Sequence, residues 1–206
     1  TGIIVTDHNW YGNTAINPNL PWKEWVEAFF AGYRNAKEEG DKVGLQVFYG
    51  YESTYPEGQD FLVYGFTIDW LKEHPEIKDA SIPEQHEIIK SIGGMVIQAH
   101  PYRESYYIEK VQTFEQHVDG IELFNASNIS YYEEGHQWNK QAVKLAADNN
   151  LPGTAGSDQH SVIPFNAGIA FPTPLTSIHD YIQRILNKDD YVMTDGVNWY
   201  NKTGET

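Results

Sequence analysis

The chain has 206 residues with a formal net charge of −15, from 14 basic and 29 acidic side chains, and it contains no cysteine. The acidic excess argues against a basic nucleic-acid-binding surface, and the absence of cysteine excludes disulfides, thiolate zinc sites and a cysteine nucleophile. The length and an aromatic content of 14% predict one globular domain over residues 1–206. No run has the length of a membrane-spanning helix and no signal-peptide pattern opens the chain, so we expect a cytoplasmic protein that does not span a membrane.

Short apolar runs alternate along the chain with amphipathic segments. Apolar runs bounded by turn residues predict strands at 2–5, 45–52, 60–66, 95–100, 120–124, 151–156, 167–171 and 191–194. Helical spacing of apolar residues predicts helices at 22–39, 106–117, 132–149 and 177–186, and a capping box from Ser81 to Glu84 opens another that ends at Gly93. We expect Gly40 to end the first helix and residues 196–206 to form a polar tail that is ordered at first and frayed toward its end. The alternation is typical of an α/β fold built on a parallel sheet.

Acidic or histidine side chains stand at the ends of four of these strands. His8 follows the first strand, Glu52 ends the second, His100 ends the strand at 95–100, and Asp158 and His160 follow the strand at 151–156. The carboxyl ends of parallel strands meet on one rim, so we expect these groups to converge. Imidazoles and carboxylates together are ligands for zinc, manganese or iron. The competing interpretation is a set of structural residues, such as a helix cap at Asp158; the recurrence at four strand ends favours a metal site.

Four short motifs in this order resemble those of the PHP (polymerase and histidinol phosphatase) family. They are Thr6-Asp7-His8, Gly50-Tyr51-Glu52, Ala99-His100-Pro101 and Gly156-Ser157-Asp158-Gln159-His160. The resemblance implies a distorted seven-stranded (β/α) barrel that holds two or three divalent metal ions. It also implies a phosphoesterase that acts on a small phosphorylated substrate.

The same resemblance assigns roles to individual residues. Glu52 would bridge two metals, Asp158 would join the first and His100 the second, and His8 and His160 would share a third. The strand at 120–124 takes the place of a further ligand in the family, either Glu122 or Asn125. Strand alternation permits only one of these two side chains to face the site.

Two further polar residues lie close to these motifs in the sequence. Arg103 follows His100 by three residues, and its guanidinium fork would clamp a phosphate; the alternative is a solvated arginine on a polar loop. Asp60 could reach the site from the neighbouring strand, but a solvated strand start is the interpretation that we favour. The predicted catalytic set is therefore Arg103, Asp158 and His160, and the predicted metal ligands are His8, Glu52, His100, Glu122, Asp158 and His160.

One departure from the family pattern concerns the start of the barrel. The family opens with a His-x-His pair on its first strand, and this sequence contains no such pair. His8 would belong to the second strand, so we expect a leading βα unit of about 30 residues to be missing. The barrel would then be incomplete at its N-terminus, with an open strand edge.

Three functions are compatible with these residues. The first is hydrolysis of a phosphomonoester or phosphodiester by a metal-bound hydroxide, because the chain has no cysteine to act as nucleophile. The second is a non-catalytic module that binds a partner or a metal, which the absence of the His-x-His pair favours. The third is a metal-dependent amidohydrolase, although no lysine ends a core strand to supply the carboxylated lysine common in such enzymes.

Overall fold

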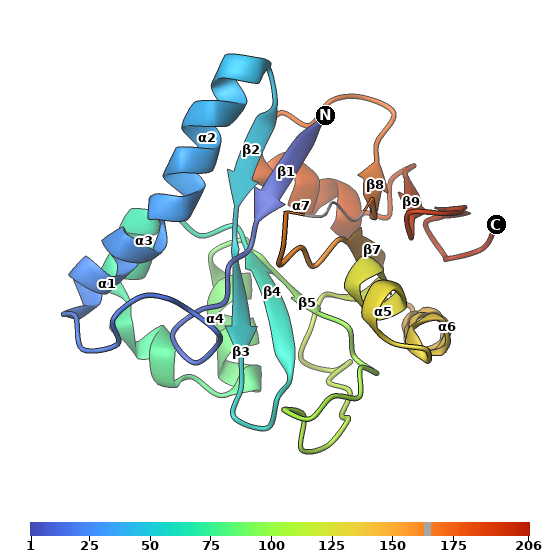
Figure 1. The fold of residues 1–206 in the computed structure, drawn as a ribbon, viewed down its shortest axis with the longest axis horizontal. Helices are drawn as coiled ribbons and strands as arrows, with labels where there is room; N and C mark the ends of the chain where they lie inside the picture. Colours follow the sequence, from blue (N-terminus) through green and yellow to red (C-terminus); the bar gives the residue numbers. More distant parts are fainter. Residues whose placement is uncertain (163–165) are drawn as a thin grey trace.

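The strands of this computed structural model, which describes residues 1–162 and 166–206, are hydrogen-bonded in three sheets (Figure 1). A two-stranded sheet pairs β1 (Gly2–Val5) in parallel with β2 (Gln46–Tyr49). The five-stranded sheet has the order β3 (Tyr51–Thr54), β4 (Asp60–Tyr64), β5 (Met95–Gln98), β6 (Gly120–Asn125), β7 (Gly153–Gly156). The three-stranded sheet has the order β10 (Trp199–Asn201), β9 (Val192–Thr194), β8 (Gly168–Ala170). The fold is mixed α/β.

The described strands do not close into the (β/α)7 barrel that the family resemblance implies. β5, β6 and β7 are parallel to one another, as expected, but β4 runs antiparallel to both of its neighbours, β3 and β5. The chain also leaves the small sheet between β2 and β3, at Gly50. A Cβ at Gly50 would lie only 2.4 Å from the carbonyl oxygen of Val63, so this close crossing needs a glycine.

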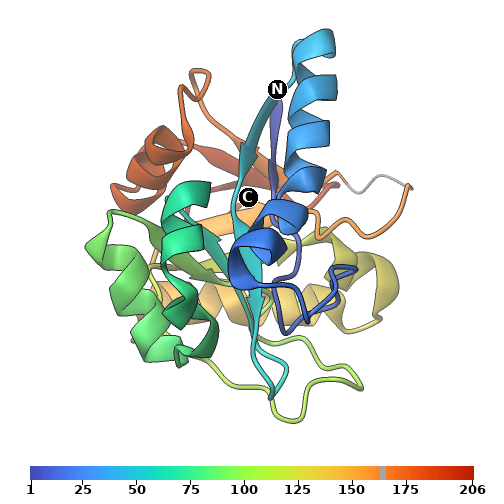
Figure 2. The same cartoon turned by 90° about the vertical axis from the view of Figure 1, so that its left-hand side faces the viewer.

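Helices flank the strands on two sides of the molecule. They are α1 (Trp22–Phe29), α2 (Ala31–Val43), α3 (Ile68–Glu73), the 3-10 helix η1 (Pro75–Asp79), α4 (Ile82–Ser91), α5 (Ala126–Tyr131), α6 (Gly135–Asp148) and α7 (Ile178–Leu186). α1, α3 and α4 lie on one side of the molecule, and α5 and α6 lie on the opposite side (Figure 1 and Figure 2). Within the described residues, no helix is long and apolar enough to cross a membrane.

Local signals in the sequence predicted several of these elements correctly. The capping box of α4 is formed, with the Ser81 backbone N–H donating to Glu84 at 2.8 Å. The helix predicted at 177–186 is α7, whose buried residues Tyr181, Ile182 and Ile185 face the core. The strand predicted at 60–66 is β4, which pairs antiparallel with β3.

Other local features of the structure differ from the predictions. The helix predicted at 22–39 is divided at Phe30 into α1 and α2, and it continues past Gly40 to Gly44, whose left-handed φ of 73° ends it. The tail at 196–206 contains a strand, β10. α5 was not predicted; its N-cap is Asn125, whose side chain accepts a hydrogen bond from the Asn128 backbone N–H.

The helix predicted at 106–117 is a loop. Two buried glutamines hold this loop against the five-stranded sheet. Gln59 donates to the Lys110 carbonyl at 2.8 Å, and Gln98 donates to the Gln112 carbonyl at 2.8 Å and accepts from the Phe114 N–H at 2.9 Å. These long-range hydrogen bonds replace the backbone bonds that a helix would make.

Candidate metal centre

Three of the converging side chains come from β1, β3 and β4. His8 follows β1 and forms an isolated parallel bridge with Glu52 of β3, and Asp60 opens β4. His8 Nε2 lies 3.8 Å from Glu52 Oε2, and one ligand atom from each of the three residues lies within 4.8 Å of the others. His8 Nδ1 lies 3.0 Å from Thr54 Oγ1, which fixes the ring so that Nε2 faces the carboxylates.

His100 joins this cluster from the end of β5. Its Nε2 lies 3.3 Å from Glu52 Oε1 and 3.6 Å from Asp60 Oδ2. Burial raises the pKa of Glu52 to about 7 and that of Asp60 to about 6, and burial also lowers the pKa of His100. Burial therefore disfavours the charged forms of these three side chains, an environment in which a cation would be the natural counter-charge.

Asp158 and His160 reach the same place from the end of β7. Asp158 Oδ1 lies 3.2 Å from His160 Nδ1, and the rings of His160 and His8 are 5.6 Å apart. Burial alone would raise the pKa of Asp158, but the hydrogen bond from His160 and the nearby His100 and Arg103 hold it well below its usual range. The hydrogen bond to Asp158 raises the pKa of His160 to about 9.

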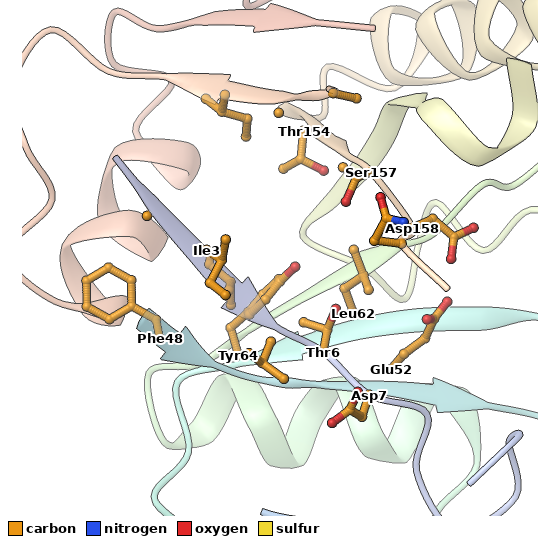
Figure 3. Close-up of a pocket in the computed structure, with 18 of the residues that line it drawn as sticks. Ile3, Thr6, Asp7, Phe48, Glu52, Leu62, Tyr64, Thr154, Ser157 and Asp158 are labelled. Carbon is orange, nitrogen blue, oxygen red and sulfur yellow. The ribbon is translucent and has the colours of Figure 1, made fainter. Parts of the chain in front are cut away.

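A cavity of about 1470 Å³ opens beside these residues (Figure 3). It runs between β1 on one side and the segments around β7 and β8 on the other. Glu52 and Asp158 lie at the same end of this cavity, and Ile3 and Phe48 lie further along it (Figure 3). The cavity lining includes His8, Glu52, His100, Asp158 and His160, so a ligand in the cavity would meet these five side chains.

Glu122 and Asn125 both lie beside the site, contrary to the prediction that only one of them would. The pairing of β6 with β7 shifts register between Glu122 and Phe124, and this irregularity breaks the strict alternation of side chains. Both residues line the cavity and are buried. Glu122 Oε2 accepts from the His100 backbone N–H at 3.0 Å and from Asn125 Nδ2 at 2.9 Å, so that oxygen is already used inside the protein.

Arg103 is not a solvated loop residue, since only 6% of it is exposed. Its guanidinium donates to Asn128 Oδ1 at 2.8 Å through Nε and to Tyr107 Oη at 3.3 Å through Nη1. Nη2 donates to Asn125 Oδ1 at 3.0 Å and to Asp158 Oδ2 at 2.5 Å. The arginine expected to clamp a phosphate therefore reaches the rim, where it is paired with a candidate ligand.

The sequence analysis did not include Asp60 among the predicted metal ligands. We expected a solvated strand start, but Asp60 is 3% exposed, and its Oδ1 is buried without a hydrogen-bond partner among the described residues. The register offered a signal: Asp60 pairs with Thr54, two residues beyond Glu52. Asp60 and Glu52 therefore share one face of the hairpin.

Two of the candidate ligands have an unusual backbone conformation. Among the described residues, four that are not glycine have a positive φ: His100 at 27°, Asp158 at 52°, and Asn150 and Lys188 at 53°. Asn150 and Lys188 lie just beyond the ends of α6 and α7, where the left-handed conformation is common. At His100 and Asp158 no helix ends, and strained residues of this kind gather at functional sites.

Comparison with known proteins gives a short sequence match and a longer structural one. Residues 136–162 match the family description "PHP-associated" (PHP_C), and no curated protein matches the chain in sequence. The fold is similar to PsfC from Pseudomonas syringae PB-5123, with 18% identity, a TM-score of 0.58, and coverage of 88% of this chain and 72% of that one. It is also similar to a two-domain protein from Bacteroides vulgatus ATCC 8482 containing a predicted PHP-like metal-dependent phosphoesterase. That likeness has 15% identity, a TM-score of 0.62, and coverage of 97% of this chain and 57% of that one. The short sequence match covers the segment that carries Asp158 and His160, and the longer likeness to the two solved structures is one of fold.

Proposed function

We propose that the protein is a metal-dependent phosphoesterase that hydrolyses a small phosphomonoester or phosphodiester. The observation that carries the proposal is the convergence of three histidines and three carboxylates from separate elements, of which all but Asp60 line one cavity. The fold likeness and the family resemblance of the motifs support it.

The donor set has the chemistry of a divalent-cation site, and we propose that it holds two or three ions. The residues His8, Glu52 and Asp60 offer nitrogen and oxygen atoms at mutual distances suited to one shared ion, and Asp60 Oδ1 is a buried oxygen without another partner among the described residues. Mixed imidazole and carboxylate ligation suits zinc, manganese or iron. The side chains that would hold the ions are His8, Glu52, Asp60, His100, Asp158 and His160.

Divalent cations at such a site supply the activation of water and the neutralisation of charge on a phosphate. The protein itself contributes position and charge. Thr54 and Glu122 fix the orientation of His8 and of the His100 backbone, at 3.0 Å each. Arg103 places a permanent positive charge beside Asp158, where it would attract a phosphate to the rim.

Activity assays with a matched pair of variants test the proposal. We would measure hydrolysis of p-nitrophenyl phosphate and bis(p-nitrophenyl) phosphate with added Mn²⁺ or Zn²⁺. The variant Glu52→Gln removes a central carboxylate, and Glu87→Gln removes an exposed carboxylate on α4 as the control. We expect Glu87→Gln to match the wild type and Glu52→Gln to lose at least about 100-fold in kcat/KM. Equal rates for the wild type and Glu52→Gln would rule out this site as the source of activity.

The ion pair between Arg103 and Asp158 favours a second candidate function, a module that binds a metal or a partner without turnover. Asp158 Oδ2 is already held at 2.5 Å by Arg103 and at 3.3 Å by Asn125. In a module of this kind the ion pair between Arg103 and Asp158 would remain intact when the metal or partner binds. Stoichiometric metal binding without turnover of either phosphoester would favour this function over hydrolysis.

A further inference from the structure

One buried asparagine uses the full hydrogen-bonding capacity of its side chain at the centre of the site. Asn125 is 1% exposed, and its Nδ2 donates to Glu122 Oε2 at 2.9 Å and to Asp158 Oδ2 at 3.3 Å. Its Oδ1 accepts from Arg103 Nη2 at 3.0 Å and from the Asn128 N–H at 2.9 Å. A side-chain amide has two donor hydrogens and two acceptor lone pairs, and all four are engaged.

The surroundings fix which way the amide points. Two carboxylates stand on one side of Asn125 and two N–H donors stand on the other. With the amide reversed, its NH₂ group would face the N–H donors of Arg103 and Asn128, and its oxygen would face the carboxylates of Glu122 and Asp158. The orientation is therefore determined by the neighbours.

These bonds join the two segments with positive φ. Glu122, which Asn125 holds, accepts the backbone N–H of His100 at 3.0 Å, and Asn125 contacts Asp158 directly. Asn125 also lies between two carboxylates that would otherwise repel each other. One amide thus links the backbone of His100 to the side chain of Asp158.

We propose that Asn125 is a positioning residue, which locks the His100 and Asp158 segments into one geometry and is not itself a ligand. The predicted effect of Asn125 on metal binding rests on the proposed function. Its predicted effect on the geometry of the His100 and Asp158 segments does not. Asn125 also caps α5, and capping alone needs only Oδ1 as the acceptor for the Asn128 N–H. The positioning role needs the two N–H donors, so the roles are separable.

The variant Asn125→Asp separates the helix-capping role of Asn125 from its positioning role. Aspartate caps a helix as well as asparagine and keeps an acceptor for Arg103, but it removes both donors and adds a negative charge beside Glu122 and Asp158. The matched control is Asn139→Asp, the same change at a 5% exposed residue of α6. Asn139 accepts a hydrogen bond from the Asn128 side chain and donates one to the Asn125 backbone carbonyl, and neither bond involves Glu122 or Asp158.

Two measurements provide the test. The first is calorimetric titration with MnCl₂, in which we expect Asn125→Asp to bind about 10–100-fold more weakly than the wild type and Asn139→Asp to bind within about 3-fold of it. The second is NMR hydrogen exchange in the metal-free protein. We expect the His100 amide to exchange at least about 10-fold faster in Asn125→Asp, with the Ile182 amide of α7 as the internal reference.

The proposal is overturned if Asn125→Asp leaves the His100 amide unchanged, if it binds Mn²⁺ as tightly as or more tightly than the wild type, or if Asn139→Asp has the same effects. A wild type that binds no Mn²⁺ would remove the proposed function, while the exchange of the His100 amide would still decide the positioning role.

Discussion

Replacing Arg103 by methionine should destabilise the metal-free protein severely, because it breaks a buried ion pair from one side. The change keeps most of the aliphatic volume, but it leaves Asp158 as a buried charge with only 7% of its side chain exposed. It also removes donors from Asn125 Oδ1 and Asn128 Oδ1. Removing one partner of such a pair typically costs about 3–5 kcal/mol. For a chain of this size about 1 kcal/mol shifts Tm by about 2–4 °C, so Tm should fall by about 6–20 °C.

The measurement is urea unfolding and thermal melting in the presence of a chelator, for the wild type, Arg103→Met, Asp158→Asn and the double variant. Because Asp158→Asn removes the stranded charge, the double variant should be more stable than Arg103→Met alone. Arg103→Lys keeps the charge but not the fork, so its stability should lie between those of the wild type and Arg103→Met. A loss below about 1 kcal/mol for Arg103→Met, or strictly additive losses in the double variant, would refute this reasoning.

Three further predictions concern single side chains of the site. The pKa of Glu52 is raised to about 7, so the folded metal-free protein binds more protons than the unfolded chain and its stability falls as the pH rises from about 4.5 to 7. Glu52→Gln should therefore melt at a higher temperature than the wild type at pH 8 in chelator, but should gain less from added Mn²⁺; a lower melting temperature would contradict the burial argument. The pKa of His160 is raised to about 9, so its contribution is complete below about pH 6.5 and is lost as the pH rises to about 9. His160→Gln should flatten the unfolding free energy over that range, and an unchanged pH profile would count against the Asp158 pairing. Thr54→Val removes the oxygen beside His8 Nδ1 and should weaken Mn²⁺ binding about 10-fold by calorimetry, whereas binding equal to that of the wild type would show that His8 needs no such support.

The positions of the strand-end motifs could be read from the sequence because each is a local pattern. A short apolar run followed by Asp, Glu or His marks the carboxyl end of a strand, and such ends lie together in α/β folds. The structure does bring His8, Glu52, His100, Asp158 and His160 to one end of a cavity. Their roles as ligands remain predictions.

What the sequence could not supply depends on contacts between distant segments. The register shift in β6 that turns Glu122 and Asn125 to the same side is a property of the pairing with β7. The burial of Arg103 depends on α5 and on the Asp158 segment. The loop at 106–117 has the spacing of a helix, and only the side chains of the neighbouring strands show why it is not one.

The division of the strands between two sheets gives a bound cation a mechanical role. His8 follows β1, which pairs along its length with β2 alone among the described strands, whereas Glu52 and Asp60 belong to the five-stranded sheet. An ion coordinated by His8, Glu52 and Asp60 would connect the two-stranded sheet to the five-stranded sheet. Fluctuations of β1 would be damped as the ion binds, and the protein would stiffen where its first strand now has only one neighbour.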